Sequence, residues 1–139
     1  MRKRFFISWS VVYISNSITG FIIHDLILKS SYKEVAENLH AHVMGRLWAF
    51  IVITIVGSFF FTLIYERWRK SGNPGEGLRY GFFIGTWVTL STYLGAYASS
   101  DAIPLSLVIK WVALGIPQFT LSGWLLGLVG SHKKLVAGN

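Results

Sequence analysis

The sequence predicts an all-α integral membrane protein that forms one domain, a bundle of four membrane-spanning helices. Of its 139 residues, 53% are hydrophobic and only 14% are charged, whereas about a quarter of an average soluble domain is charged. Four apolar runs each approach the roughly 20 residues that a helix needs to cross a bilayer. The runs lack the strict alternation of barrel strands, so helices are the expected way to satisfy their backbone in lipid.

The four predicted spans cover approximately residues 5–28, 47–65, 80–97 and 104–130. The first run follows Arg2, Lys3 and Arg4, as the core of a signal peptide would. It is longer than the roughly 7–15 residues of such a core and lacks a small-x-small cleavage site, so we expect a retained span. The last run contains Pro117, which predicts a kinked or broken helix.

An amphipathic helix is predicted over residues 31–46, at the outer face, leading into the second span. Ser31 and Glu34 have the spacing of a capping box, with Ser31 as the N-cap. Apolar residues then recur at helical spacing, which is typical of a helix lying in the membrane interface. These residues are Tyr32, Val35, Leu39 and Val43.

Lysine and arginine predict the orientation. The formal charge is +7, and nine of the 13 Lys and Arg residues fall before span one, between spans two and three, or after span four. Cytoplasmic loops carry such an excess, so both termini are expected in the cytoplasm and the protein in the inner (plasma) membrane. Because the basic residues form short clusters between apolar runs, the expected partner is the lipid bilayer and not nucleic acid.

Glycines spaced four residues apart predict where the helices pack. Small residues at this spacing let helices approach closely in lipid. Contacts inside one bundle are favoured over contacts with another subunit. The predicted packing residues are Gly77, Gly81 and Gly85 in the third run and Gly123 and Gly127 in the fourth.

Four polar residues within or at the ends of the spans are candidate substrate or ion contacts: Asn16, His24, Asp25 and Gln118. Ionisable residues inside a membrane are costly and often functional. His24 and Asp25 have two interpretations, a working site or an outer boundary where Asp25 pairs with Arg46. Gln118 follows Pro117, and polar groups beside broken helices form substrate sites in many transporters.

Catalysis and cofactor binding are not predicted. The chain has no Cys and none of the common nucleophile or metalloprotease motifs, so no catalytic residue is assigned. Weak candidate metal ligands are His24, Glu37, His40, His42 and Asp101, since His and carboxylates bind divalent metals. Residues two apart on a helix do not face the same side, so His40 and His42 would not share an ion, and no metal or cofactor is expected.

Two resemblances to known membrane proteins are present. The start of the third run at residues 76–81 (EGLRYG) and the glycine-rich last run resemble small four-span bacterial membrane proteins without an assigned function. Residues 85–93 (GTWVTLSTY) and 57–59 (GSF) resemble stretches of small four-span fluoride channels. That likeness implies an ion channel, but Thr54 stands near the place of that family's asparagine.

The composition and motifs predict a non-catalytic accessory subunit or assembly factor of a larger membrane complex. Its partners would be the bilayer and either other membrane subunits or further copies of itself. The alternative is a small oligomeric transporter or channel that uses Asn16, Gln118 and the His24 and Asp25 pair. A third hypothesis is an outer-face metal-binding protein or membrane enzyme.

Overall fold

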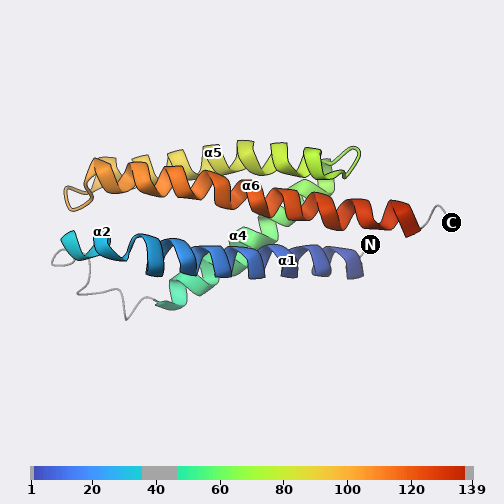
Figure 1. Cartoon of the computed structure of the whole chain (residues 1–139), viewed down its shortest axis with the longest axis horizontal. Coiled ribbons are helices and arrows are strands. Elements are labelled where there is room, and N and C mark those ends of the chain that lie inside the picture. The colour runs from blue at the N-terminus through green and yellow to red at the C-terminus, as the bar shows by residue number, and fades with distance from the viewer. Residues whose placement is uncertain (1, 36–46, 137–139) are drawn as a thin grey trace.

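The computed structural model describes residues 2–35 and 47–136, which form helices joined by short turns and contain no strand. An all-α fold is therefore confirmed for this part of the chain. The elements are α1 (Arg2–Phe21), the π-helix η1 (Ile22–Ile27), α2 (Lys29–Glu34), α4 (Leu47–Trp68), α5 (Pro74–Ser99) and α6 (Leu105–Val136) (Figure 1). The greater part of the amphipathic helix predicted over residues 31–46 lies outside the described residues.

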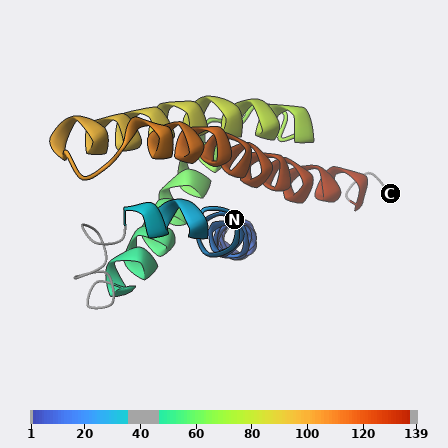
Figure 2. The same cartoon turned by 60° about the vertical axis from the view of Figure 1, so that its left-hand side comes forward.

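The four long helices run back and forth between two ends of the molecule (Figure 1). The start of α1, the turn between α4 and α5, and the end of α6 lie at one end, which we call the basic end. Its basic residues include Arg4, Arg67, Arg69, Lys70 and Arg79. At the other end lie α2 and the turn between α5 and α6. Helix α4 crosses the other three obliquely (Figures 1 and 2).

Three of these helices are long and apolar enough to cross a membrane: Lys3–Ile27, Trp48–Trp68 and Leu105–Ser131. They correspond to the first, second and fourth predicted spans. The third predicted span lies within α5, which has 26 residues and would extend about 39 Å at 1.5 Å per residue. It is long enough to cross, but its interspersed Gly, Thr, Ser and Tyr residues leave it without a stretch as apolar as those three candidate spans.

Glycines bring α5 and α6 into backbone contact. A Cβ atom added to Gly81 would lie 2.9 Å from the Cα of Thr120, and one added to Gly127 would lie 2.6 Å from the Cα of Pro74. A Cβ on Gly77 would collide with the carbonyl oxygen of Gly123. The glycines at this four-residue spacing therefore lie at one interface within the chain, which we call the glycine seam.

Two apolar clusters join the remaining helices. Near α2, the buried residues are Ile23, Leu28, Leu107, Val108 and Trp111. Toward the basic end they are Val12, Phe61, Tyr65 and Leu126, with Tyr80, Ile84 and Phe119 packed against them. Each cluster takes residues from α1 or η1 and from α6, so α1 is held along the length of α6.

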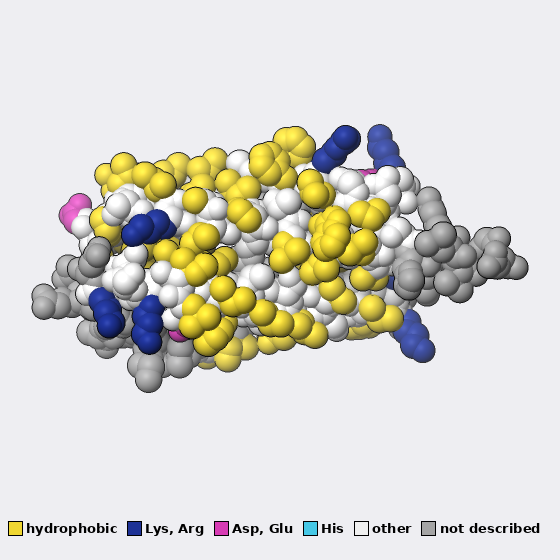
Figure 3. Space-filling model, in the orientation of Figure 1, with side chains coloured by type: hydrophobic (Ala, Val, Ile, Leu, Met, Phe, Trp, Pro, Cys, Tyr) yellow, Lys and Arg dark blue, Asp and Glu magenta, His cyan; other side chains and the backbone are white. Residues whose placement is uncertain are grey.

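The surface is apolar between the two ends, where Lys and Arg side chains are seen (Figure 3). Ile53 and Phe83 are 66% and 69% exposed, and many other large apolar side chains are also exposed. Such a continuous apolar surface indicates contact with a membrane. The fold therefore supports a lipid bilayer as the surroundings of these helices.

The prediction at Pro117 is settled only in part: a break is excluded, and a kink stays a prediction. Helix α6 continues from Leu105 to Val136 with Pro117 inside it, so the chain is not broken at this point. Proline removes one backbone hydrogen bond, and the neighbouring helices hold the rest of the helix in place. Gln118 therefore lies on a continuous helix and not at an unwound segment.

Candidate functional sites

The apolar run that contains His24 and Asp25 ends in a π-helix. The amide of Leu28 donates to the carbonyl oxygen of Ile23 at 2.8 Å, five residues back. Leu28 is buried, whereas Ile27, four residues after the buried Ile23, is 51% exposed. The wider turn thus shifts the buried face by one residue and brings Leu28 into the core. Such π-turns occur frequently at functional sites, and hydrophobic spacing alone did not predict this one.

His24 belongs to a hydrogen-bonded chain at this π-turn. Its Nδ1 lies 2.6 Å from the hydroxyl of Tyr32, and the indole Nε1 of Trp111 donates to the same hydroxyl at 2.7 Å. Because an indole nitrogen only donates, the Tyr32 hydroxyl accepts from Trp111 and can donate its own hydrogen bond to Nδ1 of a neutral His24. Burial raises the pKa of Tyr32 to about 12, against the opposing effect of the bond from Trp111. Tyr32 therefore remains protonated at neutral pH.

The ion pair predicted for Asp25 stays untested, whereas the capping box predicted at Ser31 is not formed. Asp25 is exposed, and its expected partner Arg46 lies outside the described residues. Ser31 is not an N-cap, because α2 begins at Lys29 and its N-cap, Leu28, makes no side-chain capping bond. Ser31 is instead buried and accepts a hydrogen bond of 2.8 Å from Nζ of Lys110. The capping-box prediction is therefore wrong, and Ser31 ties α2 to α6.

The candidate metal ligands are only partly described. Glu37, His40 and His42 lie outside the described residues. His24 is bonded to Tyr32, and Asp101 is exposed in the turn between α5 and α6. Within residues 2–35 and 47–136, no three His, Cys, Asp or Glu residues are arranged to hold a metal ion.

Asn16 and Gln118 come together in the middle of the bundle. The hydroxyl of Ser122 donates to Oδ1 of Asn16 at 2.7 Å, and Nε2 of Gln118 donates to the Asn16 carbonyl oxygen at 3.3 Å. Ser122 is fully buried. These three residues form a polar clamp between α1 and α6, a typical way for helices to associate in lipid. Ser122 was not among the residues predicted from the sequence.

At the basic end, two acidic residues organise the basic ones. Glu66 accepts from Arg4 at 3.4 Å and from Arg69 at 3.2 Å. Glu76 accepts from the amides of Lys70, Ser71 and Gly72 and from the Ser71 hydroxyl. Slight burial of Glu76 acts to raise its pKa, but these hydrogen bonds outweigh it and lower the pKa to about 2. The turn between α4 and α5 is therefore held closed around a carboxylate.

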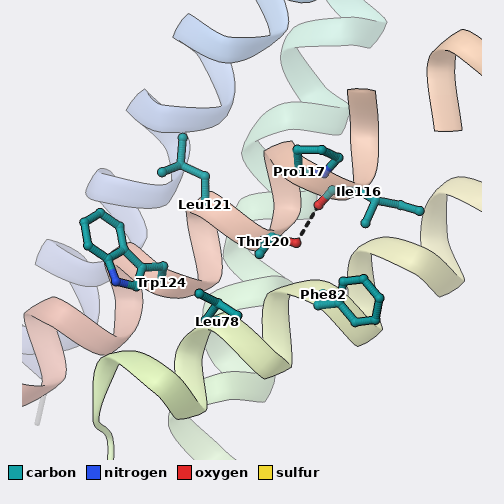
Figure 4. Close-up of a pocket in the computed structure, with 7 residues that line it drawn as sticks. All are labelled: Leu78, Phe82, Ile116, Pro117, Thr120, Leu121 and Trp124. Atoms are coloured by element: carbon teal, nitrogen blue, oxygen red, sulfur yellow. Dashed lines mark hydrogen bonds between the residues drawn. The ribbon is translucent and has the colours of Figure 1, made fainter. Parts of the chain in front are cut away.

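An apolar groove of about 480 Å³ lies on the outside of the α5–α6 pair, and we call it the Pro117 groove (Figure 4). It is lined by Leu78 and Phe82 of α5 and by Ile116, Pro117, Thr120, Leu121 and Trp124 of α6. The Thr120 hydroxyl donates to the carbonyl oxygen of Ile116 at 2.7 Å. This polar group is thus satisfied within its own helix. Pro117 was the one sequence signal at this place.

Comparison of the chain with protein-family models, curated proteins and solved structures finds no match. The resemblances drawn from short stretches of the sequence therefore stay predictions. The function must be argued from the polar clamp, the glycine seam, the open faces of the helices and the charged ends.

Proposed function

We propose that this chain is a non-catalytic accessory subunit or assembly factor of a larger membrane complex. It would lie in the inner (plasma) membrane with four spans and both termini in the cytoplasm. The alternating direction of the four long helices supports this topology (Figure 1). The Lys and Arg excess at the basic end supports the orientation.

One observation carries the proposal: the first half of α4 is largely uncovered by the described residues. None of residues 48–57 is buried, whereas Ser58, Phe61, Thr62 and Tyr65 in the second half are. A Cβ added to Gly57 would meet no atom within 4 Å. At the glycines of the seam, by contrast, the space beside the Cα atom is occupied by atoms of the facing helix.

An open glycine on a membrane helix favours a protein neighbour. In lipid, a small residue stabilises a helix pair because it lets another backbone approach closely. Gly57 thus offers α4 a contact position that the described residues leave unused. Asn16, Gln118 and Ser122 instead bond to one another. Because these polar groups in the middle of the membrane are bonded within the chain, they are not free to bind a substrate. This favours an accessory subunit over a transporter.

The test is the mass and composition of the native particle. The full chain with an affinity tag is expressed at its native level and extracted in mild detergent. We expect a particle several times heavier than 15.6 kDa that contains other membrane proteins. Gly57→Leu should release those proteins, since the added side chain fills the contact position.

Phe83→Leu is the control, because Phe83 of α5 is also exposed but already carries a large side chain, so the change fills no open contact position. It should leave the particle unchanged. A wild-type particle that contains this chain alone would overturn the proposal. Transport assays with Asn16→Ala and Gln118→Ala would then test the alternative.

A further inference from the structure

The two sides of the glycine seam differ. On one side, Tyr80 of α5 donates to the Phe61 carbonyl oxygen of α4 at 2.6 Å, and Ile84 and Phe119 pack into the cluster near the basic end. On the other side, Leu78 and Phe82 are exposed and line the Pro117 groove. Helix α4 lies behind the groove residues in Figure 4. The groove therefore faces away from the rest of the described bundle.

The groove runs from the basic end toward the middle of the bundle. A Cβ on Gly77 would meet Gly123, and one on Gly127 would meet Pro74, so these pairs lie at the same levels. Leu78 and Trp124 are therefore close to the start of α5, at the basic end. Ile116 and Pro117 lie about two turns deeper. An extended apolar chain in this groove would enter at the membrane surface and run along the helices.

Two polar groups lie at the level of the surface end of the groove: Trp124 in its lining and Arg79 next to Leu78 in the sequence. Successive residues of a helix are rotated by about 100°, so Arg79 follows Leu78 and Phe82 around α5, away from the seam. Arg79 is exposed. Trp124 is 39% exposed, and its indole N–H can only donate. Tryptophan and basic side chains are characteristic contacts of lipid headgroups.

We propose that the Pro117 groove binds one acyl chain of an anionic phospholipid, whose phosphate faces Arg79 and the indole N–H of Trp124. Charge complementarity selects this occupant, because an exposed cation and an indole donor lie at the level of the surface end of an apolar groove. The inference rests on the insertion of α5 and α6 in a membrane and is independent of the accessory role.

The headgroup is tested with a pair of arginine variants. The full chain is reconstituted into vesicles of equal parts phosphatidylglycerol and phosphatidylcholine and extracted, and the retained lipids are counted by native mass spectrometry. Wild type should retain phosphatidylglycerol preferentially. Arg79→Gln should lower this preference about fivefold, the effect of one basic residue at an anionic surface. Arg67→Gln removes an exposed arginine of α4 and should leave the preference unchanged.

The acyl chain is tested by filling the groove. Thr120→Phe should reduce the retained lipid with either headgroup. Thr54→Phe is the matched control, because Thr54 of α4 also donates to a carbonyl four residues back. Gel filtration checks that both variants are folded. If Thr120→Phe misfolds, the Arg79→Gln variant still tests the proposal.

Equal lipid retention by Arg79→Gln and Arg67→Gln, or no preference in the wild type, would overturn the proposal. So would a photoreactive side chain at Leu121 that cross-links to a protein and not to lipid. Loss of partner proteins in Gly57→Leu does not affect these readouts, so failure of the lipid site and failure of the accessory role are distinguishable.

Discussion

Glu76 shows how one carboxylate organises a turn among basic residues. Lys70 and Ser71 donate through their amides, and the Asn73 side chain caps α5 by accepting from the Glu76 amide at 2.7 Å. Gly72, with a φ of 65°, is in the left-handed region that glycine adopts readily. The turn is therefore held by bonds among its own residues.

The pH dependence of this turn follows from the lowered pKa of Glu76. The folded pKa is about 2, below the ordinary value of 4.5. The stability that Glu76 contributes is therefore fully present above about pH 4.5 and is lost as the pH falls toward 2. We expect thermal stability in detergent to fall over this interval by more in the wild type than in Glu76→Gln. Parallel pH profiles of the two proteins would contradict the assignment.

The candidate residues also show what a sequence can and cannot predict. Asn16 and Gln118 stand out because a buried amide needs partners, but nothing in the sequence indicates that they share Ser122. His24 stands out as an ionisable residue in an apolar run. Its partner Tyr32 lies 8 residues further along the chain. Trp111, which bonds to Tyr32, lies 79 residues beyond Tyr32. Such pairings depend on the fold and not on local spacing.

At the scale of the helix, the glycine seam allows a direct test. Gly81→Ala would place a methyl group 2.9 Å from the Thr120 Cα, and backbone cannot move aside cheaply. We expect a loss of about 1–3 kcal/mol, the usual cost of overpacking. Gly57→Ala, with open space around it, should be neutral or slightly stabilising. Unfolding in graded SDS, followed by circular dichroism, measures both, and equal losses would refute the close packing of α5 and α6.

The π-turn predicts an unusual tolerance to deletion. Removing Leu26, which is 62% exposed, would convert η1 to an ordinary helix and leave Leu28 four residues after Ile23. The buried face would then remain in register. Removing the exposed Ile14 from α1 should instead rotate all later buried residues out of place. The two deletion variants are compared by their yield and monodispersity after extraction. An equal loss of yield in both would contradict this account of η1.

Hydrophobic run length predicted the positions of the long helices well, because burial in lipid needs little beyond an apolar sequence of sufficient length. It predicted less about α5, where glycine and hydroxyl residues lower the hydropathy. The oblique path of α4 could not be predicted, since crossing angles depend on which side chains interlock. Pro117 alone could not distinguish a kinked helix from a broken one, and α6 is continuous through it.

At the scale of the whole molecule, the crossing of α5 is the feature most open to test. The chain contains no Cys, so single cysteines can be introduced without background. If α5 spans the membrane, Ser71→Cys and Ser100→Cys lie on opposite sides. A membrane-impermeant maleimide should label Ser100→Cys in intact cells and Ser71→Cys only after permeabilisation. Labelling of both in intact cells, or of neither, would show that α5 does not cross.

The close contact of α5 with α6 has a consequence for synthesis. As the chain leaves the ribosome, α5 emerges first and is a weaker insertion signal than α6, because its hydroxyl and glycine residues favour water more than leucine does. Its exposed backbone is covered only when residues 115–130 are available to pack against the seam. The two helices are therefore expected to enter the bilayer together as a hairpin. A nascent chain that stops before α6 should leave α5 outside the hydrocarbon.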